Sequence, residues 1–208
     1  MKPGFYLELI RTVFLAADSE GKLKNRVVLF TSTTPGEGVS YVVDLVAKEL
    51  AAQTQKRVLR VDAGVFQTPD LPDPKLMARL CEETDIENLL TLTVAQLSAG
   101  MPAVAAVGAG NAAGDWDSLP EYRAESLKAL RWNFDYILID CPSPAVASDA
   151  TTLAPLVDGV SIVVKAGQTR RGQIQRVQKM IEAAGGEFLG FVLNQRRYPM
   201  PGWLYRRL

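Results

Sequence analysis

A glycine-rich turn between a buried strand and a helix constrains the fold more than any other feature of this sequence. An apolar run at residues 26–30 predicts the strand, and the turn occupies residues 31–40. A helix should follow, because apolar residues recur there at helical spacing: Val42, Val43, Val46 and Leu50. In such an arrangement the backbone N–H groups of the turn and the positive end of the helix dipole face an anion. The sequence therefore predicts a phosphate-binding loop, called the P-loop below.

The P-loop departs from the usual pattern at its charged position. A P-loop carries a lysine just before the Ser or Thr, where it reaches the outer phosphates, and here that position is Val39. The Gly-x-x-x-x-Gly spacing also fails, because Thr33 stands five residues before Gly38. The hydroxyl that would hold Mg²⁺ is present as Ser40. We therefore predict a backbone cradle without its cation.

Composition narrows the classes of function. The chain has 208 residues, enough for one domain with a sizeable core. Lys and Arg number 23, as do Asp and Glu, so no nucleic-acid footprint covers the surface. The sequence contains no histidine, which excludes His-based acid–base catalysis, Ser-His-Asp and Cys-His sites, and His-ligated metals.

The cysteines and the hydropathy pattern bear on location. Cys81 and Cys141 are far apart without metal-binding spacing, and we expect two free thiols. No stretch approaches the roughly 20 apolar residues of a membrane span, and no signal peptide is evident. We expect a soluble, cytoplasmic protein.

Strands alternate with helices along the chain. This order predicts an α/β fold with a largely parallel sheet and helices on both faces. We predict strands at 26–30, 58–62, 103–107, 136–140, 159–165 and 188–194. We predict helices at 5–18, from the P-loop to about 55, at 75–81, 87–98 and 171–184, and after a capping box at 118–121 and after Ser148. Residues 67–74 and 108–114 should be irregular, and 1–208 should form one domain with a short basic and aromatic tail at 195–208.

Two acidic residues close predicted strands. Asp62 ends the second strand, at the sheet edge where ligands bind in open α/β folds, although a plain turn residue would look the same. Asp140 closes a continuous apolar run that fits a strand buried on both faces. Beside a P-loop, such an Asp is typical of a Walker-B carboxylate, which holds Mg²⁺ through water or together with Ser40.

Taken together, these motifs resemble those of the bacterial tyrosine kinases of capsule and exopolysaccharide synthesis (BY-kinases), which belong to the MinD/ParA-like P-loop proteins. The resemblance covers nearly the whole chain. Matching stretches are 31–40 with T-S-x-x-P-G-E-G-K-S, 58–63 with V-L-L-I-D-A-D-x-R, 135–142 with D-Y-V-I-I-D-T-P, 148–150 with S/T-D-A, 190–194 with G-V-V-L-N, and Glu8 and Arg11 with E-x-x-R-x-x-R.

The resemblance implies a site and a partner. It implies ATP or ADP with Mg²⁺ as cofactor, Ser40, Asp62 and Asp140 as metal ligands, and Asp62 as a vestigial catalytic residue. It implies that nucleotide is bound by Pro35, Gly36, Glu37, Gly38, Val39, Ser40, Tyr41 and, at the adenine, Asn194. It also implies a membrane-anchored polysaccharide chain-length-determinant protein as partner, which would bring the chain to the inner face of the membrane.

Departures from the family pattern fall at positions that would contact phosphate or metal, or lie beside them. Val39 replaces the lysine, and Gly64 and Phe66 replace the second Asp and the Arg of the acidic motif. One hydrogen bond to a charged group contributes roughly 1.5–3 kcal/mol, so losing the lysine should weaken nucleotide binding about ten- to a hundredfold. Stabilisation of charge is nearly the whole mechanism of phosphoryl transfer, so catalysis should suffer more.

Two further departures concern assembly and substrate tyrosines. Phe14 replaces the second Arg of the helix motif, and it also lies on the apolar stripe of its helix, so we expect it to pack inward. We therefore expect a monomer or a small homo-oligomer. The tyrosine cluster is reduced to Tyr198 and Tyr205, and we expect no autophosphorylation.

Three functions fit this pattern. The first is a pseudo-kinase with weak or absent nucleotide binding, acting as a regulatory or scaffolding partner in exopolysaccharide or capsule biosynthesis. The second is an atypical but active ATP-dependent tyrosine kinase or ATPase, with Arg196, Arg197 or a neighbouring subunit supplying the missing cation. The third is a MinD/ParA-like adaptor that associates with membranes through its tail.

Overall fold

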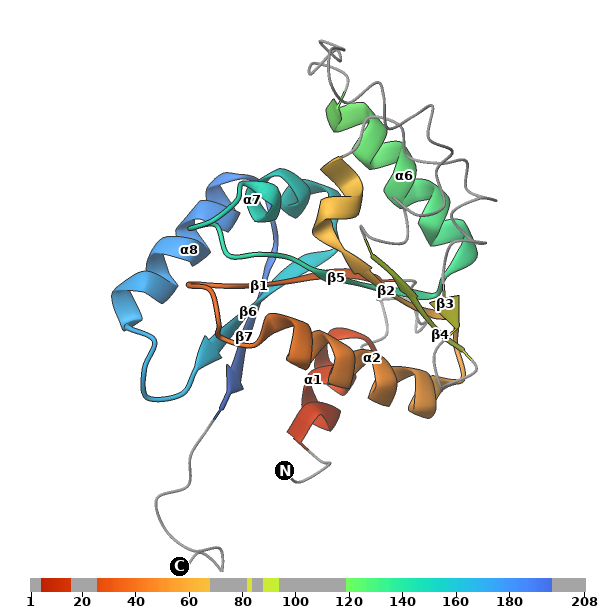
Figure 1. Cartoon of the computed structure of the whole chain (residues 1–208), viewed down its shortest axis with the longest axis horizontal. Coiled ribbons are helices and arrows are strands. Elements are labelled where there is room, and N and C mark those ends of the chain that lie inside the picture. Colours follow the sequence, from red (N-terminus) through yellow and green to blue (C-terminus); the bar gives the residue numbers. More distant parts are fainter. Residues whose placement is uncertain (1–4, 16–25, 68–81, 84–87, 94–118, 196–208) are drawn as a thin grey trace, which may run out of the picture.

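In the described part of the chain, a seven-stranded sheet forms the centre of the molecule (Figure 1). The computed structural model describes residues 5–15, 26–67, 82–83, 88–93 and 119–195. The strand order is β3-β4-β2-β5-β1-β6-β7, and every neighbouring pair is parallel except β3 with β4. The strands are β1 (Arg26–Ser32), β2 (Val58–Asp62), β3 (Glu82–Glu83), β4 (Leu89–Leu92), β5 (Tyr136–Asp140), β6 (Gly159–Lys165) and β7 (Phe188–Asn194). The predicted parallel α/β fold is confirmed.

The central strands are apolar because helices cover both of their faces. Burial extends over almost the full length of β1, β5 and β6. The helices are α1 (Phe5–Val13), α2 (Val39–Thr54), α6 (Leu119–Asn133), α7 (Asp149–Leu153) and α8 (Arg171–Ala183), with short 3₁₀ segments η1 (Ala63–Gln67) and η3 (Ala154–Leu156).

Helices form one layer on each side of the sheet. In Figure 1, α1 and α2 lie below the sheet and α6, α7 and α8 lie above it. The apolar stripe predicted for α2 faces the sheet, with Val42, Val43, Val46 and Leu50 all buried. On the other face, Val177 and Ile181 of α8 are buried, and Ile174 and Ala184 pack against the same cluster. Two apolar cores, one on each face, therefore hold the strands in place.

One predicted helix is wrong. Residues 87–98 were expected to be helical, but Leu89–Leu92 form strand β4, which pairs in parallel with β2. A short apolar run has no periodicity that separates a buried strand from a buried helix. Asn88 fixes the start of this strand, because its Nδ2 donates to the carbonyls of Ala51 and Lys56.

Other expectations fall partly or wholly outside the described residues. The helix predicted at 5–18 ends at Val13, and residues 16–18 are not described. Of the stretch 67–74, only Gln67 is described, as the end of η1. The helix at 75–81, the strand at 103–107, the loop at 108–114 and residues 196–208 of the tail lie outside the description. Among the described helices, none is long and apolar enough to cross a membrane.

Candidate nucleotide site

The P-loop joins β1 to α2 at the carboxyl end of the sheet. Gly36 and Gly38 have φ angles of +84° and +88°, in the region that favours glycine. Gly38 is the N-cap of α2, and its carbonyl accepts the first helical hydrogen bond from the backbone N–H of Val42. Gly36 and Gly38 therefore allow the chain to turn after β1 and to begin helix α2.

Glu37 turns back into the P-loop instead of reaching solvent. Its side chain is 3% exposed, and its carboxylate accepts hydrogen bonds from the backbone N–H groups of Thr33 and Thr34, at 2.7 and 3.1 Å. The Thr33 hydroxyl also donates to it, and so does the hydroxyl of Thr169, which lies between β6 and α8. Thr169 in turn accepts the backbone N–H of Lys165. Glu37 thus fixes the loop from within and ties it to a neighbouring loop.

Asn194, at the end of β7, holds the other side of the P-loop. Its Nδ2 donates to the carbonyl of Glu37 at 2.9 Å, and its Oδ1 accepts the backbone N–H of Gln195. The Asn194 side chain also lies where a side chain on Gly38 would be, since a Cβ built there is 2.4 Å from Nδ2. The resemblance implies an adenine contact for Asn194, and in this structure the same amide braces the loop.

The residues that open α2 have different surroundings. Val39 is half-buried and packs against the core on the α2 face of the sheet, which includes Val42 and Val43. Ser40 is exposed, and Tyr41 is 53% exposed. Pro35 and Gly36 are also exposed at the turn of the loop. An apolar, partly buried side chain therefore stands at position 39, and the hydroxyl of Ser40 is accessible beside it.

The two predicted metal carboxylates lie on adjacent strands. Asp62 of β2 and Asp140 of β5 are partners in the strand register, and Asp140 also pairs with Phe30 of β1. Asp140 is already engaged, because its Oδ2 accepts a hydrogen bond from Arg60 Nη2 at 2.9 Å. Exposure of the two side chains is 21% for Arg60 and 11% for Asp140, so this is a largely buried ion pair.

The Arg60–Asp140 pair bears on the metal that the resemblance implies. Mg²⁺ in nucleotide sites is held through one or two carboxylates together with the phosphates. Here one of the two candidate carboxylates is neutralised by a guanidinium within the protein. Among the described residues, no group of three or more acidic or cysteine side chains could hold a metal ion. As the structure has it, Asp140 would have to release Arg60 before its carboxylate could bind Mg²⁺.

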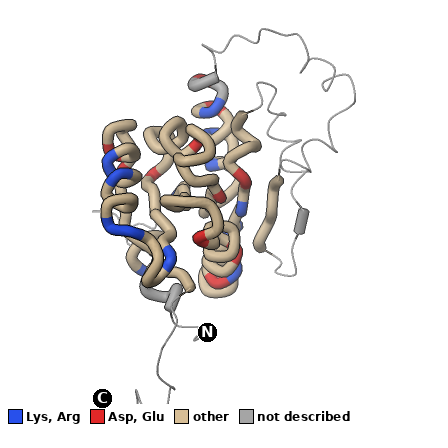
Figure 2. The backbone as a smooth tube through the Cα atoms, turned by 60° about the vertical axis from the view of Figure 1, so that its left-hand side comes forward, with Lys and Arg blue, Asp and Glu red and all other residues tan. Residues whose placement is uncertain are grey.

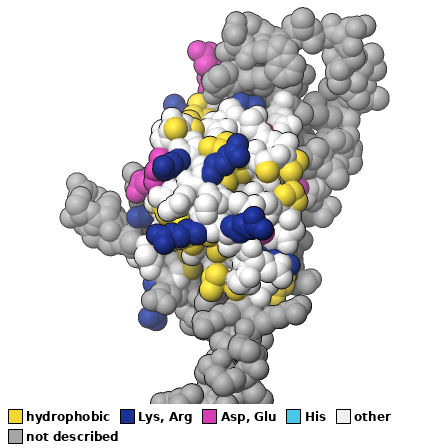
Figure 3. Space-filling model, turned by 90° about the vertical axis from the view of Figure 1, so that its left-hand side faces the viewer, with side chains coloured by type: hydrophobic (Ala, Val, Ile, Leu, Met, Phe, Trp, Pro, Cys, Tyr) yellow, Lys and Arg dark blue, Asp and Glu magenta, His cyan; other side chains and the backbone are white. Residues whose placement is uncertain are grey.

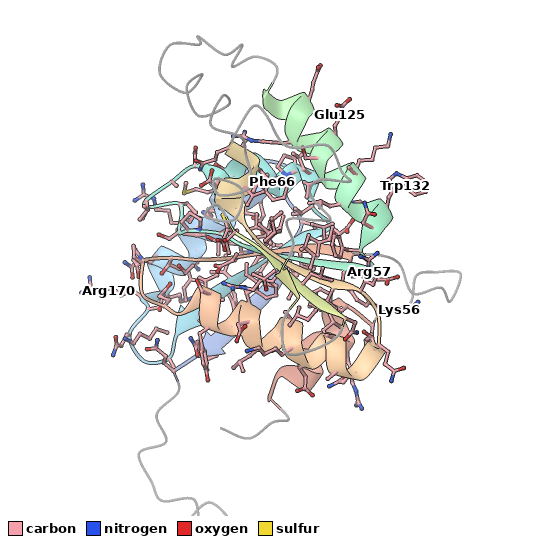
Figure 4. All side chains as sticks on the ribbon, turned by 45° about the vertical axis from the view of Figure 1, so that its right-hand side comes forward. Lys56, Arg57, Phe66, Glu125, Trp132 and Arg170 are labelled. Atoms are coloured by element: carbon pink, nitrogen blue, oxygen red, sulfur yellow. The ribbon has the colours of Figure 1, made fainter. Side chains whose placement is uncertain are left out.

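The residues that follow Asp62 belong to the apolar core. Phe66, at the position of the family arginine, is 1% exposed and belongs to the cluster on the α6–α8 side, together with Ala63 and Val65. Arg123 of α6 donates through Nε to the carbonyl of Phe66. Figure 4 shows Phe66 above the sheet, in the direction of α6. Position 66 is therefore an apolar packing position in this structure.

A polar cavity opens beside the P-loop. Its volume is about 400 Å³, and it is lined by residues 34–37 and by Lys165, Gln168, Thr169, Arg170 and Gln173. Basic and acidic residues are interspersed along much of the backbone (Figure 2), but basic side chains prevail on the face toward α8 (Figure 3). Arg170 extends outward at this end of the sheet, opposite to Lys56 and Arg57 (Figure 4). Cations are therefore available near the loop, although none stands at position 39.

The turn after β5 is buried and closely bonded. Cys141 is a free, buried thiol, and burial raises its pKa well above the ordinary value, with the carboxylates of Asp149 and Asp140 acting in the same direction. Asp149, which opens α7 as predicted, is 6% exposed and accepts a hydrogen bond from Gln67 Nε2 at 2.6 Å. Cys141 is therefore a neutral packing group, and Asp149 connects α7 to η1.

Sequence reasoning missed several of these residues. Arg60 carried a signal, because it is a lone cation inside the short apolar strand Val58–Asp62. Thr169, Lys165 and Arg170 carried none, because only the fold brings the β6–α8 connection next to the P-loop. Arg196 and Arg197, which were proposed as replacement cations, lie outside the described residues.

The fold and the loop define the class of protein. The parallel sheet with a P-loop between β1 and α2 is that of the MinD/ParA-like P-loop proteins. The MinD cell division protein of Aquifex aeolicus superposes with a TM-score of 0.58 at 18% identity, over 88% of this chain and 72% of that one. The chimerical protein CapA2B2 gives 0.64 at 22% identity, over 90% and 82%.

Within that class, the chain resembles the bacterial tyrosine kinases. It is 27% identical over 200 residues to the tyrosine-protein kinase CpsD of Streptococcus agalactiae, covering 91% of this chain and 82% of that protein. It is 28% identical over 198 residues to the succinoglycan biosynthesis transport protein ExoP of Rhizobium meliloti, covering 91% of this chain but 25% of ExoP. No known family model matches the chain. The resemblance drawn from the motifs is thus confirmed, and it is to the kinase portion of exopolysaccharide and capsule systems.

Proposed function

We propose that this chain is a pseudo-kinase: a BY-kinase-like domain that acts as a regulatory or scaffolding partner in exopolysaccharide or capsule assembly and binds nucleotide weakly or not at all. The observation that carries the proposal is the presence of a packed valine at position 39. Val39 packs against the α2-side core, so the group that would reach the outer phosphates is absent and its place is used for packing.

Changes elsewhere in the site support the same proposal. Charge stabilisation supplies most of the catalysis in phosphoryl transfer, and several charges are missing or engaged. The carboxylate of Asp140 is paired with Arg60, and Phe66 is buried where the family has arginine. Glu37 and Asn194 brace the P-loop from inside the protein. A domain with these features is suited to binding a partner in one fixed conformation.

The implied partner is a membrane-anchored chain-length-determinant protein, and the proposal places this domain beside it on the cytoplasmic side. The similarity to one quarter of ExoP, a transport protein, supports this arrangement, because there a kinase-like segment is part of a larger chain. The proposal treats residues 1–208 as a single domain.

One observation favours a second candidate, an active kinase or ATPase with relocated cations. Lys165 and Arg170 line the cavity next to residues 34–37 of the P-loop. A cation at either position would replace part of the charge that Val39 lacks, if the phosphates were shifted toward the β6–α8 connection. Lys165 is half-buried and Arg170 is exposed, so both are accessible from that cavity.

A phosphotransfer assay with a positive control separates the two candidates. The protein is incubated with Mg-ATP, alone and with the cytoplasmic segments of its chain-length-determinant protein, next to CpsD under the same conditions. The proposal expects no phosphate on Tyr198 or Tyr205 by mass spectrometry and no phosphate release above background. Stoichiometric phosphotyrosine that disappears in the Lys165→Ala or Arg170→Ala variant would establish the second candidate instead.

Complementation tests the scaffolding part of the proposal. In a strain deleted for this protein, Ser40→Ala should restore polymer production as fully as the wild type does, since Ser40 is exposed and only its metal-binding role would be lost. Failure of Ser40→Ala to complement, with normal protein levels, would contradict a catalytically silent role.

A further inference from the structure

The ion pair between Arg60 and Asp140 stands where the resemblance implies a metal ion. We propose that Arg60 takes the place of the divalent cation at Asp140, so that this site excludes Mg²⁺ and receives phosphate groups without metal. The inference goes beyond the proposed function, because it concerns which cation the site uses and not whether phosphoryl transfer occurs.

Strand geometry directs Arg60 to this carboxylate. Arg60 pairs in register with Leu138 of β5, and Asp62 pairs with Asp140 two residues further along both strands. Residues two apart on a strand share a face, so Arg60, Asp62, Leu138 and Asp140 all lie on one face of the sheet. That face is the one covered by α2, because Leu138 and Val58 belong to the same core cluster as Val42 and Val43. Arg60 therefore reaches Asp140 on the side where the P-loop enters its helix.

A guanidinium can link a carboxylate to an anion, as a metal ion does. Arginine has five N–H donors in a planar fork and keeps its charge at all ordinary pH values. One nitrogen, Nη2, is used on Asp140, whereas Nε is buried without a hydrogen-bond partner in the described part of the chain. Nε itself is closed to a ligand, so a phosphate would bind the part of the guanidinium that remains accessible, on a side chain that is 21% exposed.

Charge balance explains why Mg²⁺ and Arg60 exclude each other. A carboxylate that already holds a guanidinium at 2.9 Å would have to release it to bind a cation. The released guanidinium would then remain close to a second positive charge inside a largely buried site. Position 39 holds neither Lys nor Arg, and Arg60 supplies a positive charge directly at Asp140.

Manganese binding tests the proposal directly, with Mn²⁺ alone as the probe. Free Mn²⁺ is followed by electron paramagnetic resonance while wild type, Arg60→Leu and Arg60→Lys are titrated. Wild type and Arg60→Lys should leave Mn²⁺ free, because both keep a positive charge beside Asp140. Arg60→Leu should bind Mn²⁺ at least about tenfold more tightly, the effect of freeing one charge-assisted contact. Near-ultraviolet circular dichroism establishes that each variant is folded.

Two further measurements test whether the Mn²⁺ binds at Asp140 and whether ADP binding requires a metal ion. The double variant Arg60→Leu with Asp140→Asn should lose the gained Mn²⁺ binding, which places the metal at Asp140. Binding of a fluorescent ADP analogue to the wild type should be the same in EDTA and in MgCl₂. Mn²⁺ binding by the wild type that Asp140→Asn abolishes would overturn the proposal. Equal Mn²⁺ affinity in wild type and Arg60→Leu, or a tenfold gain in ADP binding on adding MgCl₂ to the wild type, would overturn it as well.

Discussion

The hydroxyl of Thr169 donates a hydrogen bond to the carboxylate of Glu37, although 132 residues separate the two in the sequence. This contact joins the P-loop to the connection between β6 and α8. It completes a set of donors around Glu37 in which the others come from Thr33 and Thr34 of the loop itself. The shape of the loop therefore depends on a buried anion that the protein supplies.

Removing that anion should destabilise the whole domain. In Glu37→Ala the donors around the carboxylate lose their acceptor, and we expect the free energy of unfolding to fall by about 2–4 kcal/mol. Urea unfolding measures this change. Glu125→Ala is the matched control, because Glu125 is exposed on α6 (Figure 4), and it should have little effect. Equal stability of the two variants would show that the buried network is not required.

The two P-loop glycines should respond differently to the same substitution. Both have positive φ angles, so an Ala at either position costs about 1–2 kcal/mol in backbone strain. At Gly36 a Cβ meets nothing within 4 Å, whereas at Gly38 it lies 2.4 Å from Asn194 Nδ2. Gly38→Ala should therefore lower the melting temperature clearly more than Gly36→Ala. Equal shifts would mean that Asn194 moves aside without loss.

Restoring the lysine should recover binding more than catalysis. Val39→Lys should strengthen ADP binding by roughly ten- to a hundredfold, the effect of one charge-assisted contact. The gain should be at the lower end, because Val39 packs against the core and a lysine gives up part of that contact. Calorimetric titration compares wild type, Val39→Lys, Val39→Met as an apolar control, and Val39→Lys with Gly64→Asp. Full ATPase turnover in the single variant would contradict our view that the changes in the site act together.

An arginine should not be tolerated at position 66. Phe66 of η1 is buried in the cluster that it shares with residues of α6 and the sheet, and an unpaired charge there should cost about 3–5 kcal/mol of stability. Phe66→Leu conserves the apolar character and should cost less than about 1.5 kcal/mol. Chemical denaturation of both variants checks this difference. A stable Phe66→Arg protein would mean that the guanidinium finds a route to solvent.

Assembly should also be limited by a buried aromatic ring. Phe14 is fully buried and packs edge-on against Tyr136, with ring centroids 5.8 Å apart, as its place on the apolar stripe predicted. We expect light scattering to find a monomer or a small oligomer. Arg11→Ala, at an exposed position on α1, should leave that mass unchanged, whereas Phe14→Arg should unfold the protein instead of enlarging it. A stable octamer would contradict this expectation.

Local sequence pattern was enough for the parts of the fold that depend on local burial. The runs that became β1, β5 and β6 are apolar throughout because helices cover both sides of them, and continuous apolar runs predict that environment. Leu89–Leu92 is too short to show a hydrophobic period. It forms a strand because it pairs with β2, and that pairing cannot be read from the sequence.

The candidate site also has features that one segment of sequence predicts and contacts between segments that it does not. The turn, its glycines and the acids closing β2 and β5 were predictable because each follows from its own segment. The bonds that Glu37, Asn194 and Arg60 make could not be predicted, because each joins segments whose spacing only the sheet order determines. Arg60 could have been noticed as a charge within an apolar strand, but its partner followed only from the register of β2 with β5.

The hydrogen bond from Asn194 to the carbonyl of Glu37 links residues 157 positions apart and has a consequence for synthesis. During synthesis the N-terminus leaves the ribosome first, so β1, the P-loop and α2 emerge long before β7 does. Until residue 194 has left the exit tunnel, the P-loop lacks one of the two braces that set its shape. A partner that recognises the finished loop would therefore distinguish chains in which β7 has joined the sheet from chains in which it has not.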